Sequence, residues 1–456
     1  MKKFSSILFV ITLLSVTARA QFNLGIATGN WSGISALALN PANIAGAREK
    51  YSVSIFAVNA GVDNNVGTFN IKNGFVLAVG DGKSNNMFSY SNNSKVSAVA
   101  PYITVTGPGV MYRIDKKNTI AFTTALKGMN QFNNFDQSIF HSFNDSKFRS
   151  SETIDATSQK FNYTVHLWSE VGLSYATTLL DKGSNRLKMG VTLRYLGGIA
   201  YVGVKGRNMN AHFDAAKDTF SAKNTDLEYA SNVLTTTGSG SNVNGNIAGL
   251  LFNGNAGNGF GGDIGAVYEY TPLAERKNGY LVRFSAAVMD LGSIYYRGSN
   301  NRVETFTGNG NVTGQGIIDN VKNFNDLQRY ATQRGFTADI QKTSTTIYMP
   351  TRLMLGGDYR AYKSVYVNVT YLFNLANRQN YGNSFYNQFT VTPRYETRLF
   401  TAGLPLTYST LSNSFKVGLG LQASALFLGF DDMLGLFSHS QAGVNFYAGV
   451  NLRLYK

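Results

Sequence analysis

Few side chains in this sequence have the types and spacing that catalysis or metal binding requires. The four histidines, His141, His166, His212 and His439, are far apart, and no pair of them has metal-ligand spacing. The sequence contains no cysteine, which excludes thiolate metal sites and disulfides. No nucleophile elbow or paired-carboxylate constellation stands out. We therefore predict that the protein is not an enzyme and uses no cofactor and no metal.

Two glycine-rich motifs resemble nucleotide-binding motifs but lack the required context. Gly257 to Gly262 satisfies G-x-G-x-x-G, which serves dinucleotide binding only between a strand and a helix. Here a Gly/Asn-rich stretch precedes the motif and an alternating segment follows it, which favours a flexible loop. Gly82-Lys83-Ser84 is similar to the end of a phosphate-binding loop, but Leu77 stands where the first glycine is needed.

Three polar residues, His166, Glu170 and Arg194, occupy the polar face of alternating segments. His166 and Glu170 share one face of a predicted strand but lie two inward positions apart. That separation is too long for a direct hydrogen bond in an extended strand. We predict that all three line a polar lumen rather than form an acid–base pair.

Strict apolar/polar alternation recurs along the chain and identifies the elements that would carry these residues. Such alternation, joined by short polar turns such as 115–118 and 181–184, predicts an all-β, antiparallel transmembrane β-barrel of about 14 strands. The alternating segments are 51–59, 118–126, 163–175, 188–196, 263–270, 281–289, 351–360, 365–373, 417–427 and 443–456.

The composition agrees with a barrel and argues against nucleic-acid binding. Charged residues make up only 15% of the chain, and there are 47 Gly, 26 Tyr and 31 Phe. The formal net charge is +15, but the basic residues are scattered, with no run longer than Lys116-Lys117. We expect this diffuse charge to meet outer-membrane lipid and lipopolysaccharide, and we expect no nucleic-acid partner.

The first 20 residues have the features of a secretory signal peptide. Lys2 and Lys3 precede a mostly apolar run, and Ala18-Arg19-Ala20 is a small-residue cleavage signal. We therefore expect 1–20 as signal peptide, 21–50 as an N-terminal plug or hatch, and 51–456 as the barrel. After cleavage the protein would reside in the bacterial outer membrane. The barrel-assembly machinery would recognise the final strand, in which the aromatic Tyr455 is penultimate.

The N-terminal stretch Asn30 to Arg48 contains a predicted short helix that is broken at Asn40-Pro41-Ala42. We predict that these three residues belong to a plug or gate inside the lumen. The alternative is an irregular periplasmic entry to the first strand.

Three long stretches interrupt the alternation: 128–160, 205–262 and 297–346. We predict that they are long extracellular loops, with a short helix from Val321 to Gln333.

Several of these motifs carry a family resemblance. Asn40-Pro41-Ala42 after a small-residue helix resembles the N-terminal hatch of FadL-type long-chain fatty-acid transporters. The phrase 285–294 and the ending 417–449 resemble an uncharacterised outer-membrane family of the Bacteroidetes, which carries a domain of unknown function and is thought to form FadL-like barrels. The resemblance implies a plugged outer-membrane barrel but supplies no substrate.

Three hypotheses for the function remain at this point. The first is passage or binding of a hydrophobic or amphipathic small molecule, gated by the N-terminal stretch. The second is a structural or docking subunit of an outer-membrane assembly, such as type IX secretion or gliding machinery, with 205–262 as the docking surface. The third is a soluble, β-rich periplasmic protein.

Overall fold

The computed structural model describes residues 23–69, 88–138, 153–156, 160–214, 219–232, 256–273, 279–298, 301–313, 316, 319–321, 324–432 and 442–455. The predicted signal peptide lies outside these residues. The expected 14 strands are confirmed, because the chain forms a closed antiparallel barrel of that number. The barrel closes where the last strand, β24 (Gly443–Leu454), pairs with the first, β1 (Tyr51–Asn64).

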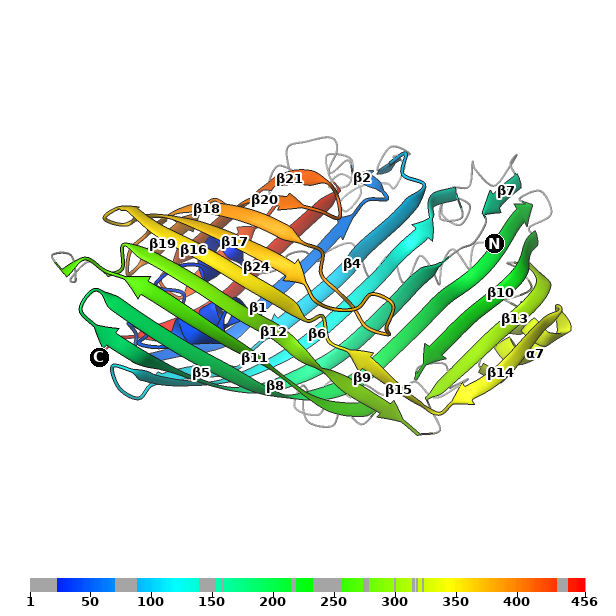
Figure 1. The fold of residues 1–456 in the computed structure, drawn as a ribbon, viewed down its shortest axis with the longest axis horizontal. Helices are drawn as coiled ribbons and strands as arrows, with labels where there is room; N and C mark the ends of the chain where they lie inside the picture. The colour runs from blue at the N-terminus through cyan, green and yellow to red at the C-terminus, as the bar shows by residue number, and fades with distance from the viewer. Residues whose placement is uncertain are drawn as a thin grey trace.

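The other positions around the wall follow the order of the chain (Figure 1). Three of these positions are each built from two shorter strands: β4 with β5, β19 with β20, and β21 with β22. The wall strands are β4 (Lys95–Thr106), β5 (Gly109–Arg113), β6 (Asn118–Asp136), β8 (Phe161–Lys182), β9 (Asn185–Asp214), β11 (Gly257–Tyr270), β12 (Val282–Arg297), β16 (Arg352–Tyr362), β17 (Val365–Asn374), β18 (Gln388–Glu396), β19 (Phe400–Gly403), β20 (Leu406–Ser409), β21 (Ser414–Val417), β22 (Leu419–Ala423) and β23 (Leu426–Phe430).

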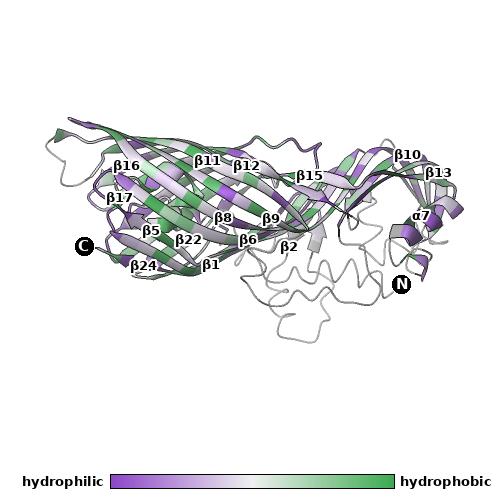
Figure 2. Cartoon of the chain, turned by 90° about the horizontal axis from the view of Figure 1, so that it is seen from below, coloured by the Kyte–Doolittle hydropathy of each residue, from purple (hydrophilic) through white to green (hydrophobic). Residues whose placement is uncertain are grey.

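The predicted alternation of faces is borne out in these strands. On β8, Leu173 is 60% exposed on the outer face, whereas His166 on the inner face is 1% exposed. Because the side-chain period of a strand is two, an apolar outer face and a polar inner face follow from the same pattern. Figure 2 shows hydrophobic and hydrophilic residues alternating along wall strands such as β5 and β22.

One predicted strand, 417–427, is wrong. Ala423 and Leu426 pair directly across a two-residue turn, and Ser424 adopts a left-handed conformation with φ of 52°. The chain therefore reverses at 424–425, between β22 and β23. The reversal places Phe427 inside the barrel, on the face opposite to the predicted one.

The predicted long loops are partly wrong, because much of their length is β-structure. β6 and β9 run on beyond the alternating segments. Of the further strands, β7 and β10 pair with the end of β9, β13 pairs with β10 and β14, and β15 pairs with β12. These strands are β7 (Thr153–Ala156), β10 (Thr219–Ser231), β13 (Arg302–Thr313), β14 (Phe336–Lys342) and β15 (Ser344–Tyr348). Two short strands, β2 (Gly67–Phe69) and β3 (Phe88–Tyr90), form a separate pair.

The part of β9 that pairs with β10 is residues 202–214. We call this part, together with β10, β13 and β14, the extension (Figure 1). Its strands carry only short alternating stretches, such as 208–214 on β9 and 336–340 on β14, which the sequence analysis assigned to long loops. The predicted helix is confirmed in its larger part as α7 (Phe324–Gln333), which packs against β14.

The N-terminal segment (residues 23–50) contains three short helical turns: α2 (Leu24–Ala27), η1 (Gly33–Ala38) and η2 (Pro41–Ile44). They contact wall strands from several sides of the barrel, including β1, β9, β11 and β22, and therefore lie in the lumen. Among the described residues no helix is long and apolar enough to cross a membrane.

Candidate functional site

Asn40, which we predicted as part of a plug, joins the N-terminal segment to two wall strands. It is 2% exposed, and its side-chain Oδ1 accepts a hydrogen bond from the Ala42 amide at 2.8 Å, which caps η2. Its Nδ2 donates to the carbonyls of Ala266 on β11 and Ala286 on β12, both at 3.1 Å. Pro41 occupies the first helical position, where a missing N–H costs no hydrogen bond.

The wall makes room for this turn with glycines. A Cβ at Gly190 on β9 would lie 2.5 Å from the Ala42 nitrogen and 2.6 Å from the Pro41 carbonyl oxygen. A Cβ at Gly265 on β11 would collide with the Asn40 side chain. The predicted gate residues thus pack directly against the inner face of β9 and β11.

Polar side chains of the wall hold the rest of the N-terminal segment from several directions. The donors and acceptors come from β12, β16, β18 and β24, so the segment is fixed across the width of the lumen. The bonds run from Arg283 to the Thr28 carbonyl (2.7 Å), from Arg352 to the Ala38 carbonyl (3.3 Å), from Asn451 to the Ser35 hydroxyl (2.6 Å) and from the Asn30 amide to Glu396 (2.8 Å).

The predicted lumen residues His166 and Glu170 lie inside the barrel and do not touch each other directly. Trp168 lies between them on the same face of β8. Its ring stacks on His166 with centroids 4.6 Å apart, and its Nε1 donates to Glu170 at 2.8 Å. The other side of His166 meets Tyr296, whose hydroxyl is 2.9 Å from Nε2.

Arg194 and Glu170 belong to a buried cluster of six charges that we call the ion-pair network. Its members are Lys127, Glu170, Arg194, Asp263, Asp290 and Arg352. Lys127 Nζ lies 2.9 Å from Glu170 and 3.5 Å from Asp290. Arg194 Nε lies 3.3 Å from Glu170, and both of its terminal nitrogens donate to Asp263. Arg352 pairs with Asp290.

Sequence reasoning found two members of this network and missed the other four. Each missed residue lies on a different strand, and the network forms only when β6, β11, β12 and β16 close around the lumen. A detectable signal was present, because Asp263 and Arg352 are charged residues at inward positions of alternating segments.

A cavity of about 1260 Å³, partly open to solvent, lies between the network and the N-terminal segment, and we call it the chamber. Ile34, Leu37 and Ala38 of the segment form one side of it. Its remaining lining combines charged network residues with the apolar and aromatic side chains of Tyr102, Met129, Trp168, Met289 and Phe385.

The chamber also reaches an irregular part of the wall. Gly107, with φ of 106°, separates β4 from β5, and Thr106 and Gly109 on either side line the chamber. Ser54 of β1 pairs with Gly109 of β5, and Ala57 of β1 pairs with Thr106 of β4. Between them, Ile55 and Phe56 pair with neither strand. The wall is therefore irregular where the chamber touches it.

A loop between β17 and β18 covers another side of the chamber, and the sequence analysis did not foresee it. This inner loop (residues 375–387) is held by amide side chains of the wall. Gln131 Nε2 donates to the Ser384 carbonyl at 2.9 Å, and Gln131 Oε1 accepts from the Ser384 amide at 2.6 Å. Asn162 donates to two further loop carbonyls at 2.8 and 2.9 Å. Phe385, from the same loop, reaches the chamber.

Residues 41–431 match the model of a family of unknown function, DUF5723. The chain belongs to this family. The resemblance to an uncharacterised family, drawn from the sequence motifs, is thereby confirmed. No curated protein matches the chain.

Solved structures similar to this DUF5723 member are of the FadL type. The Ralstonia pickettii toluene transporter TbuX is 13% identical, with 97% of this chain and 100% of that chain covered and a TM-score of 0.43. The P. putida toluene transporter TodX is 11% identical, with 93% and 95% covered and a TM-score of 0.43. A Pseudomonas aeruginosa FadL homologue is 10% identical, with 95% and 96% covered and a TM-score of 0.42.

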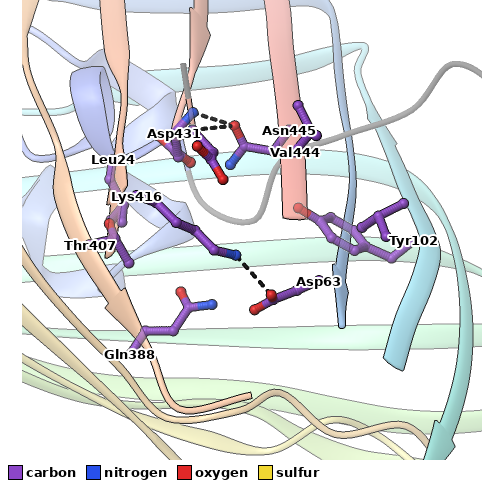
Figure 3. Close-up of a pocket in the computed structure, with 11 residues that line it drawn as sticks. Leu24, Asp63, Tyr102, Gln388, Thr407, Lys416, Asp431, Val444 and Asn445 are labelled. Carbon is purple, nitrogen blue, oxygen red and sulfur yellow. Dashed lines mark hydrogen bonds and ion pairs between the residues drawn. The ribbon is translucent and has the colours of Figure 1, made fainter. Parts of the chain in front are cut away.

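A second, much smaller cavity lies beside the chamber in this DUF5723 barrel (Figure 3). Tyr102 borders both cavities. Lys416 Nζ pairs with Asp63 at 2.8 Å, and the Ser409 hydroxyl donates to the other oxygen of Asp63 at 2.6 Å. Within the described part of the chain, no group of three or more His, Asp or Glu side chains is placed to hold a metal ion.

Proposed function

We propose that this DUF5723 member is an outer-membrane barrel that binds and passes a hydrophobic or amphipathic small molecule, with the N-terminal segment as its gate. The observation that carries the proposal is the chamber. It joins apolar and aromatic side chains to a polar wall, and both the N-terminal segment and the inner loop border it. Sites for small molecules are typically concave and mostly apolar, with a few placed polar groups.

The outer surface supports the proposed location. Leu193 is 68% exposed and Phe260 is 77% exposed on the wall, where lipid would cover them. The lumen, in contrast, holds the charged network. The final strand β24, ending next to Tyr455, is the element that the barrel-assembly machinery would read. On this proposal, cleavage of the signal peptide produces the mature protein, and lipid and lipopolysaccharide surround the mature barrel.

Fractionation and gel mobility test the location. A folded barrel in the outer-membrane fraction should migrate faster unboiled than boiled. Recovery of the protein in the soluble periplasmic fraction would contradict the proposal.

The gate is tested by removing its main anchor. Asn40→Ala removes two hydrogen bonds to the wall and the cap of η2. The matched control is Asn43→Ala, because the Asn43 side chain donates within the segment, to the Ala36 carbonyl at 3.4 Å. We expect Asn40→Ala alone to raise the permeability of reconstituted vesicles to a small hydrophobic dye. Equal permeability of both variants and the unmodified protein would contradict gating.

A second candidate function, a docking subunit of an outer-membrane assembly, is favoured by the extension. β10 pairs along its length with both β9 and β13, so the extension is a continuous sheet that projects beyond the barrel. Replacing 215–256 with a short Gly/Ser turn removes β10. If docking is the function, a partner captured specifically by the full chain should be lost with this variant, while permeability stays unchanged.

A further inference from the structure

We infer that the chamber accepts an uncharged amphiphile, such as a long-chain alcohol, ester or amide, in preference to a free carboxylate or an amine. This inference rests on the proposed binding function and specifies the chemistry of the ligand. Two observations carry it: the cations and carboxylates of the ion-pair network pair with one another, and Lys127 lies at the edge of the network.

The network is balanced within itself. It contains three cations and three carboxylates, and every cation lies within ion-pair distance of a carboxylate. Asp263 has a fully buried side chain behind Arg194, which it binds through both oxygens. The polar side of the chamber therefore presents hydrogen-bonding groups but carries no net charge.

A charged ligand would unbalance this arrangement. A bound carboxylate would either displace Glu170 or Asp290 from one of its cations or add a further negative charge beside them in a buried site. An ammonium ligand would compete in the same way for the carboxylates. Removing one partner of a buried ion pair is strongly unfavourable, so both kinds of ligand are disfavoured.

An uncharged oxygen meets no such competition. Lys127 is the network cation with the most exposed side chain, at 21%, and its two ion-pair partners are Glu170 and Asp290. An ammonium group has three N–H donors, so a third donor can serve a hydroxyl or carbonyl oxygen of a ligand without displacing either carboxylate. Lys127 is thus the residue that would orient the polar end.

The apolar end would lie against adaptable side chains. Met129 and Met289 line the chamber with Trp168 and Phe385. Thioethers adjust to irregular shapes, and aromatic rings accept either a chain or a ring, so this part of the lining selects for apolarity rather than for one outline.

The chain offers an internal probe for the test. It contains only two tryptophans, Trp31 and Trp168, and only Trp168 lines the chamber. Trp31→Phe therefore leaves Trp168 as the single tryptophan. The matched control, Trp168→Phe, keeps Trp31, which packs on Tyr455 with ring centroids 5.7 Å apart.

The experiment titrates Trp31→Phe protein in phosphatidylcholine nanodiscs with dodecan-1-ol, dodecanoate and dodecylammonium. We expect the alcohol to change Trp168 fluorescence with a Kd about tenfold below those of the two charged probes. The Trp168→Phe control should show no saturable change. Tighter binding of dodecanoate or dodecylammonium would overturn the inference while leaving the proposed function intact. Saturable binding of none of the three would count against the proposed function itself.

A charge variant tests the cause. Glu170→Gln removes one negative charge from the network with little change of shape. We expect dodecanoate to bind about tenfold more tightly to this variant, with alcohol binding changed by less than about threefold. Asp290→Asn provides a second variant, should the first lose its heat-dependent gel mobility. Unchanged dodecanoate binding in a correctly folded variant would show that the network does not set the selectivity.

Discussion

At the residue scale, single residues of the N-terminal segment and of the wall decide where the segment lies. Asn40 links the segment to β11 and β12 through one side-chain amide. The approach is close enough that the facing wall positions, Gly190 and Gly265, have no room for a Cβ atom. Glycine at these inward positions therefore allows the segment to pack directly against the wall.

Gly190→Ala should displace the segment without unfolding the barrel. The added methyl group would meet backbone atoms of Pro41 and Ala42, which cannot rotate away, and overpacking of this kind costs about 1–3 kcal/mol. We expect faster protease cleavage within 23–50, measured on protein with unchanged heat-dependent gel mobility. Gly357→Ala is the control, because its nearest contact would be an ordinary 3.9 Å. Equal cleavage of the two variants would refute the packing argument.

Glu49, at the end of the segment, should make stability depend on pH. It is 1% exposed, and burial raises the pKa of its carboxyl despite the opposing charges of Arg453 and Arg48. A raised folded-state pKa means that the stabilisation is complete below the unfolded-state pKa and is lost as pH rises through the raised value.

The unmodified protein should therefore lose stability more steeply than Glu49→Gln, which stays neutral, as pH rises above the ordinary pKa of a glutamate carboxyl, about 4.3. The midpoint temperature for loss of the fast-migrating gel form measures this difference. Parallel pH profiles for the two proteins would exclude Glu49 as the titrating group.

At the scale of elements, the inner loop is the least expected feature. Its backbone runs through the lumen without a regular ladder of strand hydrogen bonds, and side-chain amides of the wall bond to it instead. Gln131 bonds to the backbone of Ser384, and Asn162 donates to the carbonyls of Arg378 and Asn380. Buried backbone groups require such partners, so polar residues at inward positions of β6 and β8 are a structural necessity for this loop.

Gln131→Ala should loosen the inner loop. It removes the acceptor of the Ser384 amide and a donor to the Ser384 carbonyl, each contributing about 1 kcal/mol. We expect faster hydrogen–deuterium exchange in peptides covering 375–387. Thr390→Ala is the matched control, because it removes a buried hydroxyl contact of the wall, 2.9 Å from Thr407, instead of a contact to the loop. If exchange rises equally in both variants, the effect belongs to the barrel and not to the loop.

At the scale of the whole molecule, the barrel is apolar outside and charged inside, while the extension has no continuous apolar face. Figure 2 shows this change along the molecule, from the hydrophobic wall to the more polar β13 and α7. The extension still has a small core of its own, in which Met209, Ala211 and Ala222 are buried. The two parts therefore suit different surroundings.

Leu193→Arg should oppose membrane insertion, because this residue is 68% exposed on the outer wall. Placing Arg on a lipid-facing position near the middle of the bilayer costs about 2–4 kcal/mol. We expect a lower folded fraction in urea titrations with lipid vesicles. Thr337→Arg, on an exposed position of β14 in the extension, should leave this fraction unchanged. A similar loss in both variants would contradict the assignment of the outer wall to lipid.

The alternation of residues along the chain determined the fold class, the strand number and the face on which His166, Glu170 and Arg194 lie. This was possible because side-chain direction in a strand is a local property with a period of two. Tertiary structure decided the rest. The turn at 424–425 depends on one left-handed residue, and the strands of the extension are identified by their pairing with β9 and with one another. The ion-pair network and the inner loop join residues far apart in sequence, such as Gln131 with Ser384, so only closure of the barrel brings them together.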